Sequence, residues 1–189
     1  MPLTKLDTIP ALVVIDLQKG IVASPAVHPI SEIVERTAQL ARAFRERALP
    51  VVLVNVIAAA PGRTDAGARN LSSLPADWSE LVPELEQQPG DHLVSKQRVG
   101  AFIGTDLDDY LRQRGVTQVV LTGVSTSAGV EATARSAYDY GYNVVLVLDA
   151  MTDRNADAHR HSTETIFPRL GETTTTDNVL KLLKQRPPQ

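Results

Sequence analysis

The stretch LTGVSTSAGVEATARSA, from Leu121 to Ala137, runs from apolar residues through a turn of small and hydroxylated ones into a helical pattern. Many α/β folds present reactive groups on such a strand, turn and helix, because main-chain N–H groups point outward where the helix begins. The stretch therefore predicts an α/β fold, and it raises the question of whether the turn carries a nucleophile.

Other apolar runs extend this strand into a sheet. Their residues are apolar and often β-branched at consecutive positions, which is typical of parallel strands covered on both faces. We expect strands at Ala11–Asp16, Val51–Val56, Val116–Val124 and Asn143–Ala150, and a weaker one at Asp91–Lys96.

Helical patterns separate most of these runs, and two of them end at a glycine suited to a helix C-cap, Gly115 and Gly141. This order predicts a three-layer α/β/α fold with a doubly wound, mostly parallel, Rossmann-like sheet, in a single domain over residues 1–189. The expected helices are Ile30–Arg47, Asp106–Gln113, Ala128–Tyr140 and a short helix in the tail, which begins with a turn at Thr173.

The composition favours a small-molecule partner. The 189 residues are 43% hydrophobic and 22% charged, with a net charge of -3 that offers no attraction to nucleic acid or to an anionic membrane. No apolar run is long enough to span a bilayer and the N-terminus has no signal-peptide pattern, so we expect a cytoplasmic protein. The chain has no cysteine, which excludes disulfides, thiolate metal sites and thiol nucleophiles.

A long segment, Ile57–Pro89, interrupts the alternation of strands and helices. It contains the only tryptophan, Trp78, and two arginines, Arg63 and Arg69. A loop of this length in a compact domain is usually functional, often as a lid or an oligomer contact, although a surface excursion without a role is the alternative. The arginines are candidate contacts for a substrate carboxylate, or else solvated charges.

Polar side chains follow several of the predicted strands at the edge where ligands bind in open α/β sheets. Asp16 leaves its strand half removed from water and is a candidate proton carrier, or the cap of the next turn. Lys96 ends another strand and is either catalytic or solvated. An acid and an ammonium at one edge can orient and tune each other, which favours a catalytic pair. The other polar residues at these strand ends are Gln18, Asn55, Asp149 and Asp153.

The turn itself offers hydroxyls at Ser125, Thr126 and Ser127. Ser127 lies where a helix N-cap is expected, so capping competes with a role as nucleophile. The main-chain amides from Ser125 to Gly129 form a candidate pocket for an anion or oxyanion. Gly129 costs helix stability relative to alanine, which indicates that something needs the space.

The histidines do not predict a metal site. His159 and His161 are two positions apart on an expected helix and so do not share a face. His28 and His92 show no ligand spacing either, and we expect neither a metal nor another cofactor.

Four motifs together resemble the isochorismatase-like hydrolases, relatives of nicotinamidases and N-carbamoylsarcosine amidases. They cover most of the chain outside the long loop. The motifs are VVIDLQKG (Val13–Gly20), SKQRVGAFIGTDLDDYL (Ser95–Leu111), QVVLTGVSTSAGVEATARSAYDYGYNVVLVLDAMTD (Gln118–Asp153) and HRHSTETIFPRLGE (His159–Glu172).

The resemblance implies a catalytic triad of Asp16, Lys96 and a cysteine, but Gly129 stands at the cysteine position. It also implies a cis peptide at Val124–Ser125, with the amides of Ser125 and Gly129 as the oxyanion pocket. The metal ligands of the nicotinamidase branch have no counterpart in residues 57–69, and family members form dimers or larger homo-oligomers.

Without the thiol, a thioester intermediate is not available at this position. The true isochorismatases also carry glycine there and hydrolyse a vinyl ether without a covalent intermediate, so we expect general acid–base hydrolysis of a small anionic substrate. Asp16 would be the acid, Lys96 would bind a carboxylate or steer the proton, and Gly129 would leave room for substrate. The expected substrate-binding residues are Gln18, Phe102, Ser125, Thr126, Ser127, Arg63 and Arg69.

Two alternatives remain open at this level. One is an amide or ester hydrolase that uses Ser127 or an activated water in place of the thiol. The other is a catalytically silent binding protein or scaffold that keeps the pocket without the chemistry.

Overall fold

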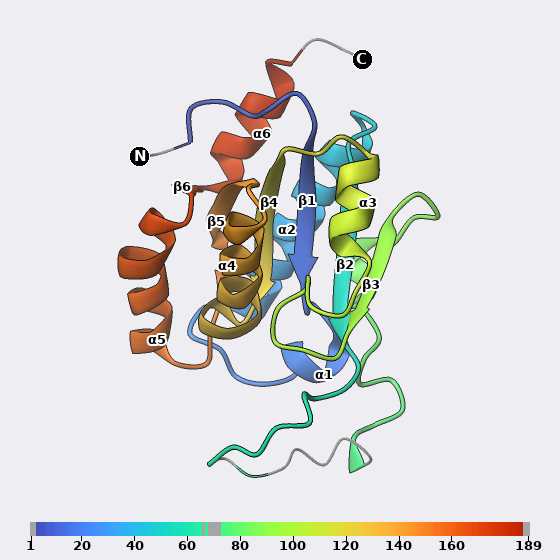
Figure 1. The fold of residues 1–189 in the computed structure, drawn as a ribbon, viewed down its shortest axis with the longest axis vertical. Coiled ribbons are helices and arrows are strands. Elements are labelled where there is room, and N and C mark those ends of the chain that lie inside the picture. Colours follow the sequence, from blue (N-terminus) through green and yellow to red (C-terminus); the bar gives the residue numbers. More distant parts are fainter. Residues whose placement is uncertain (1–2, 66, 68–72, 187–189) are drawn as a thin grey trace.

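The computed structural model describes residues 3–65, 67 and 73–186. Its strands are all parallel and form one sheet in the order β3-β2-β1-β4-β5-β6 (Figure 1). The order reverses between β1 and β4, and such a reversal opens a crevice at the carboxyl edge of a sheet. The strands are β1 (Pro10–Ile15), β2 (Val51–Val56), β3 (His92–Lys96), β4 (Gln118–Val124), β5 (Asn143–Thr152) and β6 (Glu172–Thr174).

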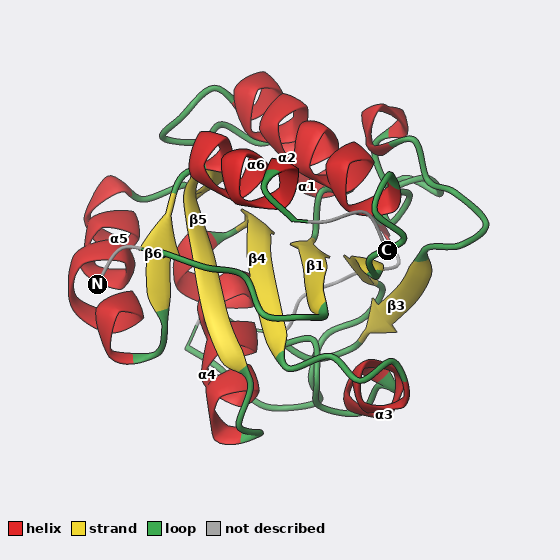
Figure 2. Cartoon of the chain, turned by 90° about the horizontal axis from the view of Figure 1, so that it is seen from above, coloured by secondary structure: helices red, strands yellow, loops and turns green. Residues whose placement is uncertain are grey.

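Helices cover both faces of the sheet, which confirms the predicted three-layer fold (Figure 2). Helices α1, α2 and α6 lie on one face, α3 and α4 lie on the other, and α5 stands beside the edge strand β6. The helices are α1 (Lys19–Val22), α2 (Ile30–Arg45), α3 (Leu107–Gln113), α4 (Glu131–Asp139), α5 (Ala156–His161) and α6 (Thr176–Lys184). None of the described helices is both long and apolar enough to cross a bilayer.

The consecutive apolar residues of the strands supply two separate cores. Leu12 and Val14 of β1 pack with α2 and α6, whereas Val13 and Ile15 pack on the side of α3 and α4. All four side chains are fully buried. Because successive side chains of a strand point to opposite faces, a strand between two helical layers is apolar at every position.

The sixth strand differs from prediction. Residues Glu172–Thr174 pair with Val145–Val147 of β5, although we expected only a turn at Thr173. Three polar residues form no apolar run, and their pairing at the sheet edge is decided by β5 rather than by their own sequence. The helix expected to reach Arg47 ends at Arg45, and Ala48 then adopts a left-handed conformation with φ of 53°.

The far end of the long loop is fastened to the residues that follow β1. The N–H of Gly20 donates to the Trp78 carbonyl at 3.0 Å, and the N–H of Lys19 donates to the Glu80 carbonyl at 2.8 Å. The Trp78 ring lies directly over Gly20, where a Cβ atom would come within 1.8 Å of Trp78 Cδ1. Glycine is therefore the residue that lets the loop close onto this segment.

Candidate active site

Asp16 and Lys96 form a buried ion pair at the carboxyl edge of the sheet. Asp16 follows β1 with φ of 52°, a left-handed conformation that aspartate tolerates better than most residues. Lys96 ends β3, two strands away, and its Nζ lies 2.8 Å from Asp16 Oδ2. Only 6% of Asp16 and 2% of Lys96 are exposed, so the structure brings the predicted pair together in a place that excludes water.

The ammonium of Lys96 is held by three acceptors. Besides Asp16 Oδ2, it donates to the carbonyls of Val99 at 3.0 Å and Arg98 at 3.3 Å. A lysine ammonium has three N–H groups, so these contacts use its whole donor capacity. The geometry favours a lysine that orients and tunes Asp16 over one that binds a substrate carboxylate directly.

Asp16 keeps one oxygen free. Burial raises the pKa of Asp16 to about 6, and the nearby charge and hydrogen bond of Lys96 oppose that rise. Oδ2 faces Lys96, whereas Oδ1 is buried and has no hydrogen-bond partner among the described residues. A proton on Asp16 therefore resides on Oδ1, where no protein group competes for it.

Gly129 lies against this carboxylate. A Cβ atom at position 129 would be 3.1 Å from Asp16 Oδ2 and 3.0 Å from Ile15 Cγ2, closer than side-chain atoms normally approach. Glycine at this position thus keeps the space beside the carboxylate open, which accounts for a helix-weakening residue in the turn that precedes α4.

The residues after β4 form a π-helical turn, Thr126–Val130, which we call the π turn. It follows a cis peptide bond at Val124–Ser125, as the resemblance implied. The Ser125 carbonyl accepts hydrogen bonds from the amides of Ala128 at 3.1 Å and Val130 at 3.2 Å. Among the described contacts the intervening Gly129 amide does not share this acceptor, so it remains a candidate donor to a bound anion.

Ser127 is not the N-cap of the helix, because it lies inside the π turn and Ser125 occupies the cap position. Its N–H and its hydroxyl both donate to Asp153 Oδ2, each at 2.8 Å. Burial acts to raise the pKa of Asp153, but the Ser127 hydrogen bonds and two main-chain donors outweigh it and lower that pKa. An ionised carboxylate of this kind anchors the serine and is a weak base for activating it.

Thr126 points inward and is fully buried, and its Oγ1 lies 2.9 Å from His159 Nδ1 on α5. Neither this contact nor the Ser127–Asp153 contact was predicted as a pair, although Asp153 was identified as a polar residue at a strand end. The partners are 33 and 26 positions apart, and no local pattern joins them.

Two other residues that were predicted to bind substrate, Gln18 and Phe102, make contacts within the protein. Gln18 is fully buried, and its side-chain amide bonds to the main chain of Val56 and Trp78. The Phe102 ring packs in the core against Tyr140 and Tyr142, which lie at the opposite end of α4 and just before β5. The Gln18 amide is therefore used by main-chain groups, and the ring contacts described for Phe102 are with tyrosines.

Of the two loop arginines, the structure describes only Arg63. Arg63 is exposed on the long loop, and Arg69 lies outside the described residues. Asn55, at the end of β2, accepts from the Ser95 hydroxyl and donates to the Ser79 carbonyl, both at 2.8 Å, and so also fastens the loop.

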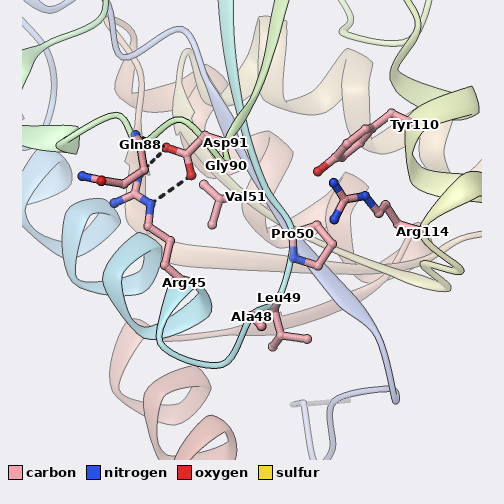
Figure 3. A pocket seen from close by; sticks show the side chains of 10 residues that line it. All are labelled: Arg45, Ala48, Leu49, Pro50, Val51, Gln88, Gly90, Asp91, Tyr110 and Arg114. Carbon is pink, nitrogen blue, oxygen red and sulfur yellow. Dashed lines mark hydrogen bonds and ion pairs between the residues drawn. The ribbon is translucent and has the colours of Figure 1, made fainter. Parts of the chain in front are cut away.

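Two hollows in the described surface are lined by residues other than Asp16 and Lys96. One, of about 240 Å³, is lined by residues near the start of β2, among them Arg45, Asp91, Tyr110 and Arg114 (Figure 3). The other, of about 540 Å³, lies between α2, β5 and the start of α6. No group of three or more histidine, aspartate or glutamate side chains is arranged to hold a metal ion in the part of the chain that the structure describes.

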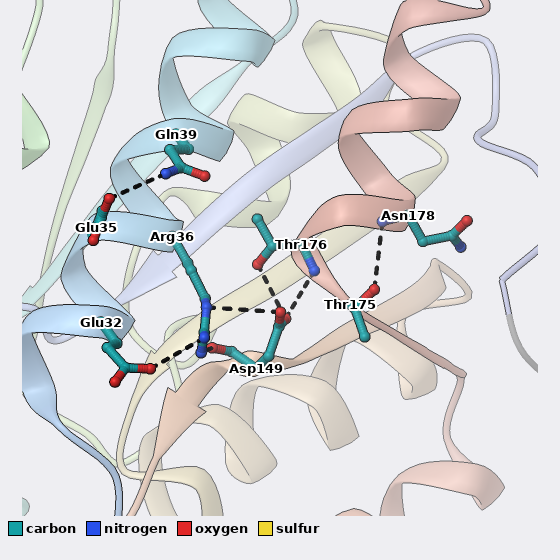
Figure 4. A network of polar contacts seen from close by, with 8 residues as sticks. All are labelled: Glu32, Glu35, Arg36, Gln39, Asp149, Thr175, Thr176 and Asn178. Carbon is teal, nitrogen blue, oxygen red and sulfur yellow. Dashed lines mark hydrogen bonds and ion pairs between the residues drawn. The ribbon is translucent and has the colours of Figure 1, made fainter.

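Asp149, another polar residue at a predicted strand end, has a structural role on the rim of the larger hollow (Figure 4). Its Oδ1 accepts from the N–H and the hydroxyl of Thr176 at the start of α6, at 2.8 and 3.0 Å. Arg36 of α2 donates to the Asp149 carbonyl at 2.8 Å. These contacts join two helices to β5 and leave Asp149 outside the candidate site.

Comparison with known proteins agrees with the fold and the motifs. Residues 10–178 match the family model described as the Isochorismatase domain. The uncharacterized isochorismatase family protein YwoC of Bacillus subtilis is 41% identical over 180 residues, which cover 92% of this chain and 94% of that protein. A maleamate amidohydrolase of Pseudomonas putida is 29% identical over 185 residues, with coverages of 93% and 87%.

A solved structure of an isochorismatase family protein from Burkholderia thailandensis superposes with a TM-score of 0.90. It is 44% identical in sequence, and the match covers 96% of this chain and 98% of that chain. The chain therefore belongs to the isochorismatase family, whose members are hydrolases.

Proposed function

We propose that the protein hydrolyses a small anionic metabolite by general acid–base catalysis without a covalent intermediate. The observation that carries this proposal is the buried pair of Asp16 and Lys96 facing Gly129. Oδ2 is held by the lysine and lies against Gly129, which offers space but no side chain, whereas Oδ1 has no hydrogen-bond partner among the described residues. Such an arrangement can deliver a proton and cannot form an acyl intermediate at position 129.

Asp16 is the acid of this mechanism. Its Oδ1–H protonates the terminal carbon of an enol ether, and water then adds to the resulting oxocarbenium ion. The hemiketal that forms loses its alcohol, and the proton released by the water restores Asp16. Lys96 keeps the carboxyl in place through Oδ2 and limits the rise of its pKa, so that the acid is strong enough to donate.

The π turn is the proposed binding site for the anionic part of the substrate. The amides of Ser125 and Gly129 are the candidate donors, whereas the Ser127 amide is already bonded to Asp153. Arg63 and Arg69 of the long loop remain candidate contacts for a carboxylate. The relative from Pseudomonas putida acts on maleamate, a small carboxylate, which supports a substrate of this class. Assembly into a dimer or larger homo-oligomer stays a prediction.

The test is a panel of isochorismate, small amides, lactams and esters, assayed with the wild type and with Asp16→Asn. We expect a compound that the wild type hydrolyses and that the variant binds without turnover, because an amide carries no transferable acid proton. Full activity in Asp16→Asn would refute the proposal. A covalent adduct on Ser127, detected by mass spectrometry during turnover, would instead establish the serine hydrolase.

A further inference from the structure

The π turn is fastened from outside by side chains that follow β5. These side chains belong to one short segment, and each reaches a different residue of the π turn or of the first position of α4. The bridges run from Asp153 to Ser127, from His159 to Thr126 and from the Ser162 hydroxyl to Glu131 Oε2 at 2.6 Å.

The bridge between His159 and Thr126 fixes the tautomer of the histidine. The Thr126 hydroxyl is fully buried and needs an acceptor for its proton. Among the described contacts its Oγ1 is paired with His159 Nδ1 alone, at 2.9 Å. If Nδ1 carried a proton, the hydroxyl hydrogen would have no acceptor, so Nδ1 accepts and the neutral ring carries its proton on Nε2.

The surroundings of His159 keep this ring neutral. Burial and the neighbouring His28 lower the pKa of His159, while Asp153 acts in the opposite direction. The two imidazole rings meet edge to face, with centroids 4.8 Å apart. The carboxylate of Glu131 on α4 is bound by Arg135 and by the Ser162 hydroxyl.

We propose that His159 is a positioning residue of the active site. By accepting the Thr126 hydrogen bond, its neutral ring fixes the π turn and so holds the main chain of Gly129 beside Asp16. The inference rests on the proposed function for the role of Asp16, but the two can fail separately, because one concerns a proton donor and the other the order of a turn.

Two variants with different acceptor positions test this role. In His159→Asn the side-chain amide stands near the former Nδ1 and can supply its oxygen to Thr126. In His159→Gln the amide stands near the former Nε2 and cannot. His161→Asn is the matched control, because His161 is exposed on the same helix.

Hydrogen–deuterium exchange reads the order of the turn without a substrate. The amides of Ala128 and Val130, which bond to the Ser125 carbonyl, report on it directly. We expect them to exchange roughly fivefold faster in His159→Gln than in His159→Asn, the effect of losing one ordinary hydrogen bond. In a Thr126→Val background, which lacks the hydroxyl, the two variants should exchange alike.

Nitrogen-15 NMR of the imidazoles completes the test, and the neutral His159 ring should show a protonated Nε2 and an unprotonated Nδ1. With isochorismate as the probe substrate, kcat should follow the exchange data, with His159→Asn above His159→Gln. A protonated Nδ1 in the neutral ring, or equal exchange in both variants with Thr126 intact, would overturn the inference. Loss of all turnover in Asp16→Asn together with equal exchange in the His159 variants would retain the proposed function and reject the positioning role.

Discussion

Replacing Lys96 by methionine should move the pH profile of the enzyme to higher pH. The substitution keeps an unbranched chain of similar length and removes its charge. In the wild type the pKa of Asp16 is raised to about 6, chiefly by burial, with Lys96 opposing the rise. An acid must hold its proton to donate it, so kcat/KM should be level below that pKa and fall about tenfold per pH unit above it.

The distance between the two charges sets the size of the shift. At 2.8 Å between Nζ and Oδ2, and with an effective dielectric constant of about 20, the attraction is on the order of several kcal/mol. Each pKa unit corresponds to about 1.36 kcal/mol, and relaxation of the site offsets part of the loss, so the alkaline limb should rise by at least about one pH unit. The plateau rate should fall as well, because a weaker acid donates less readily.

The assay is hydrolysis of a panel compound across the pH range, with Asp16→Asn as the control that lacks the titrating group. Carbon-13 NMR of the Asp16 carboxyl gives the same midpoint without any substrate. The reasoning is refuted if the midpoint in Lys96→Met stays where it was or moves to lower pH, since the titrating group would then not be the buried carboxyl beside the lysine.

Three further predictions concern stability and space at the same edge. The folded-state pKa of Asp16, about 6, exceeds its usual value of 3.8, so its stabilising contribution is greatest in acid and is lost as the pH rises through 6. The free energy of unfolding of the wild type, relative to Asp16→Asn in urea titrations, should fall by about 2 kcal/mol between roughly pH 4.5 and pH 8, and a rise would contradict the sign. Gly129→Ala should lower kcat/KM about tenfold or more while the protein stays folded by circular dichroism, because the methyl group reaches the Asp16 carboxylate. Gly20→Ala should destabilise the protein by about 1–3 kcal/mol in thermal unfolding, because the methyl group displaces the Trp78 ring, and an unchanged midpoint would show that the ring is not fixed there.

The sequence predicted the layered fold because its strands are covered on both faces. Consecutive apolar residues in β1 supply both cores, and this pattern is visible without a structure. Strand β6 was not predicted, since Glu172–Thr174 has no apolar run and its pairing depends on the exposed edge of β5. An apolar pattern in the sequence detects a strand whose own side chains are buried in the core. It misses a strand that forms only because it pairs with a neighbouring edge strand.

Some contacts of the candidate site could also be predicted from the sequence, and others could not. Asp16 and Lys96 were predicted to meet because parallel strands end at one edge, and the structure places them 2.8 Å apart. The pairing of His159 with Thr126 depends on where α5 packs against the π turn, which no spacing within the sequence reveals. Gln18 has a polar side chain at the correct edge, but its amide is used by main-chain groups of the loop, and only the coordinates show this.

The attachment of Trp78 over Gly20 separates a tethered base of the long loop from an exposed span, Ala58–Asp65 and Gly67. The base, residues 77–82, is joined to residues 17–20 by main-chain hydrogen bonds and by the tryptophan ring. The described residues of the span, from Ala58 to Asp65 and Gly67, are exposed or partly exposed, and none of them is buried in the core. Substitutions or changes of length in that span should therefore leave the buried pair of Asp16 and Lys96 undisturbed, because exposed loops tolerate such changes far better than a core does.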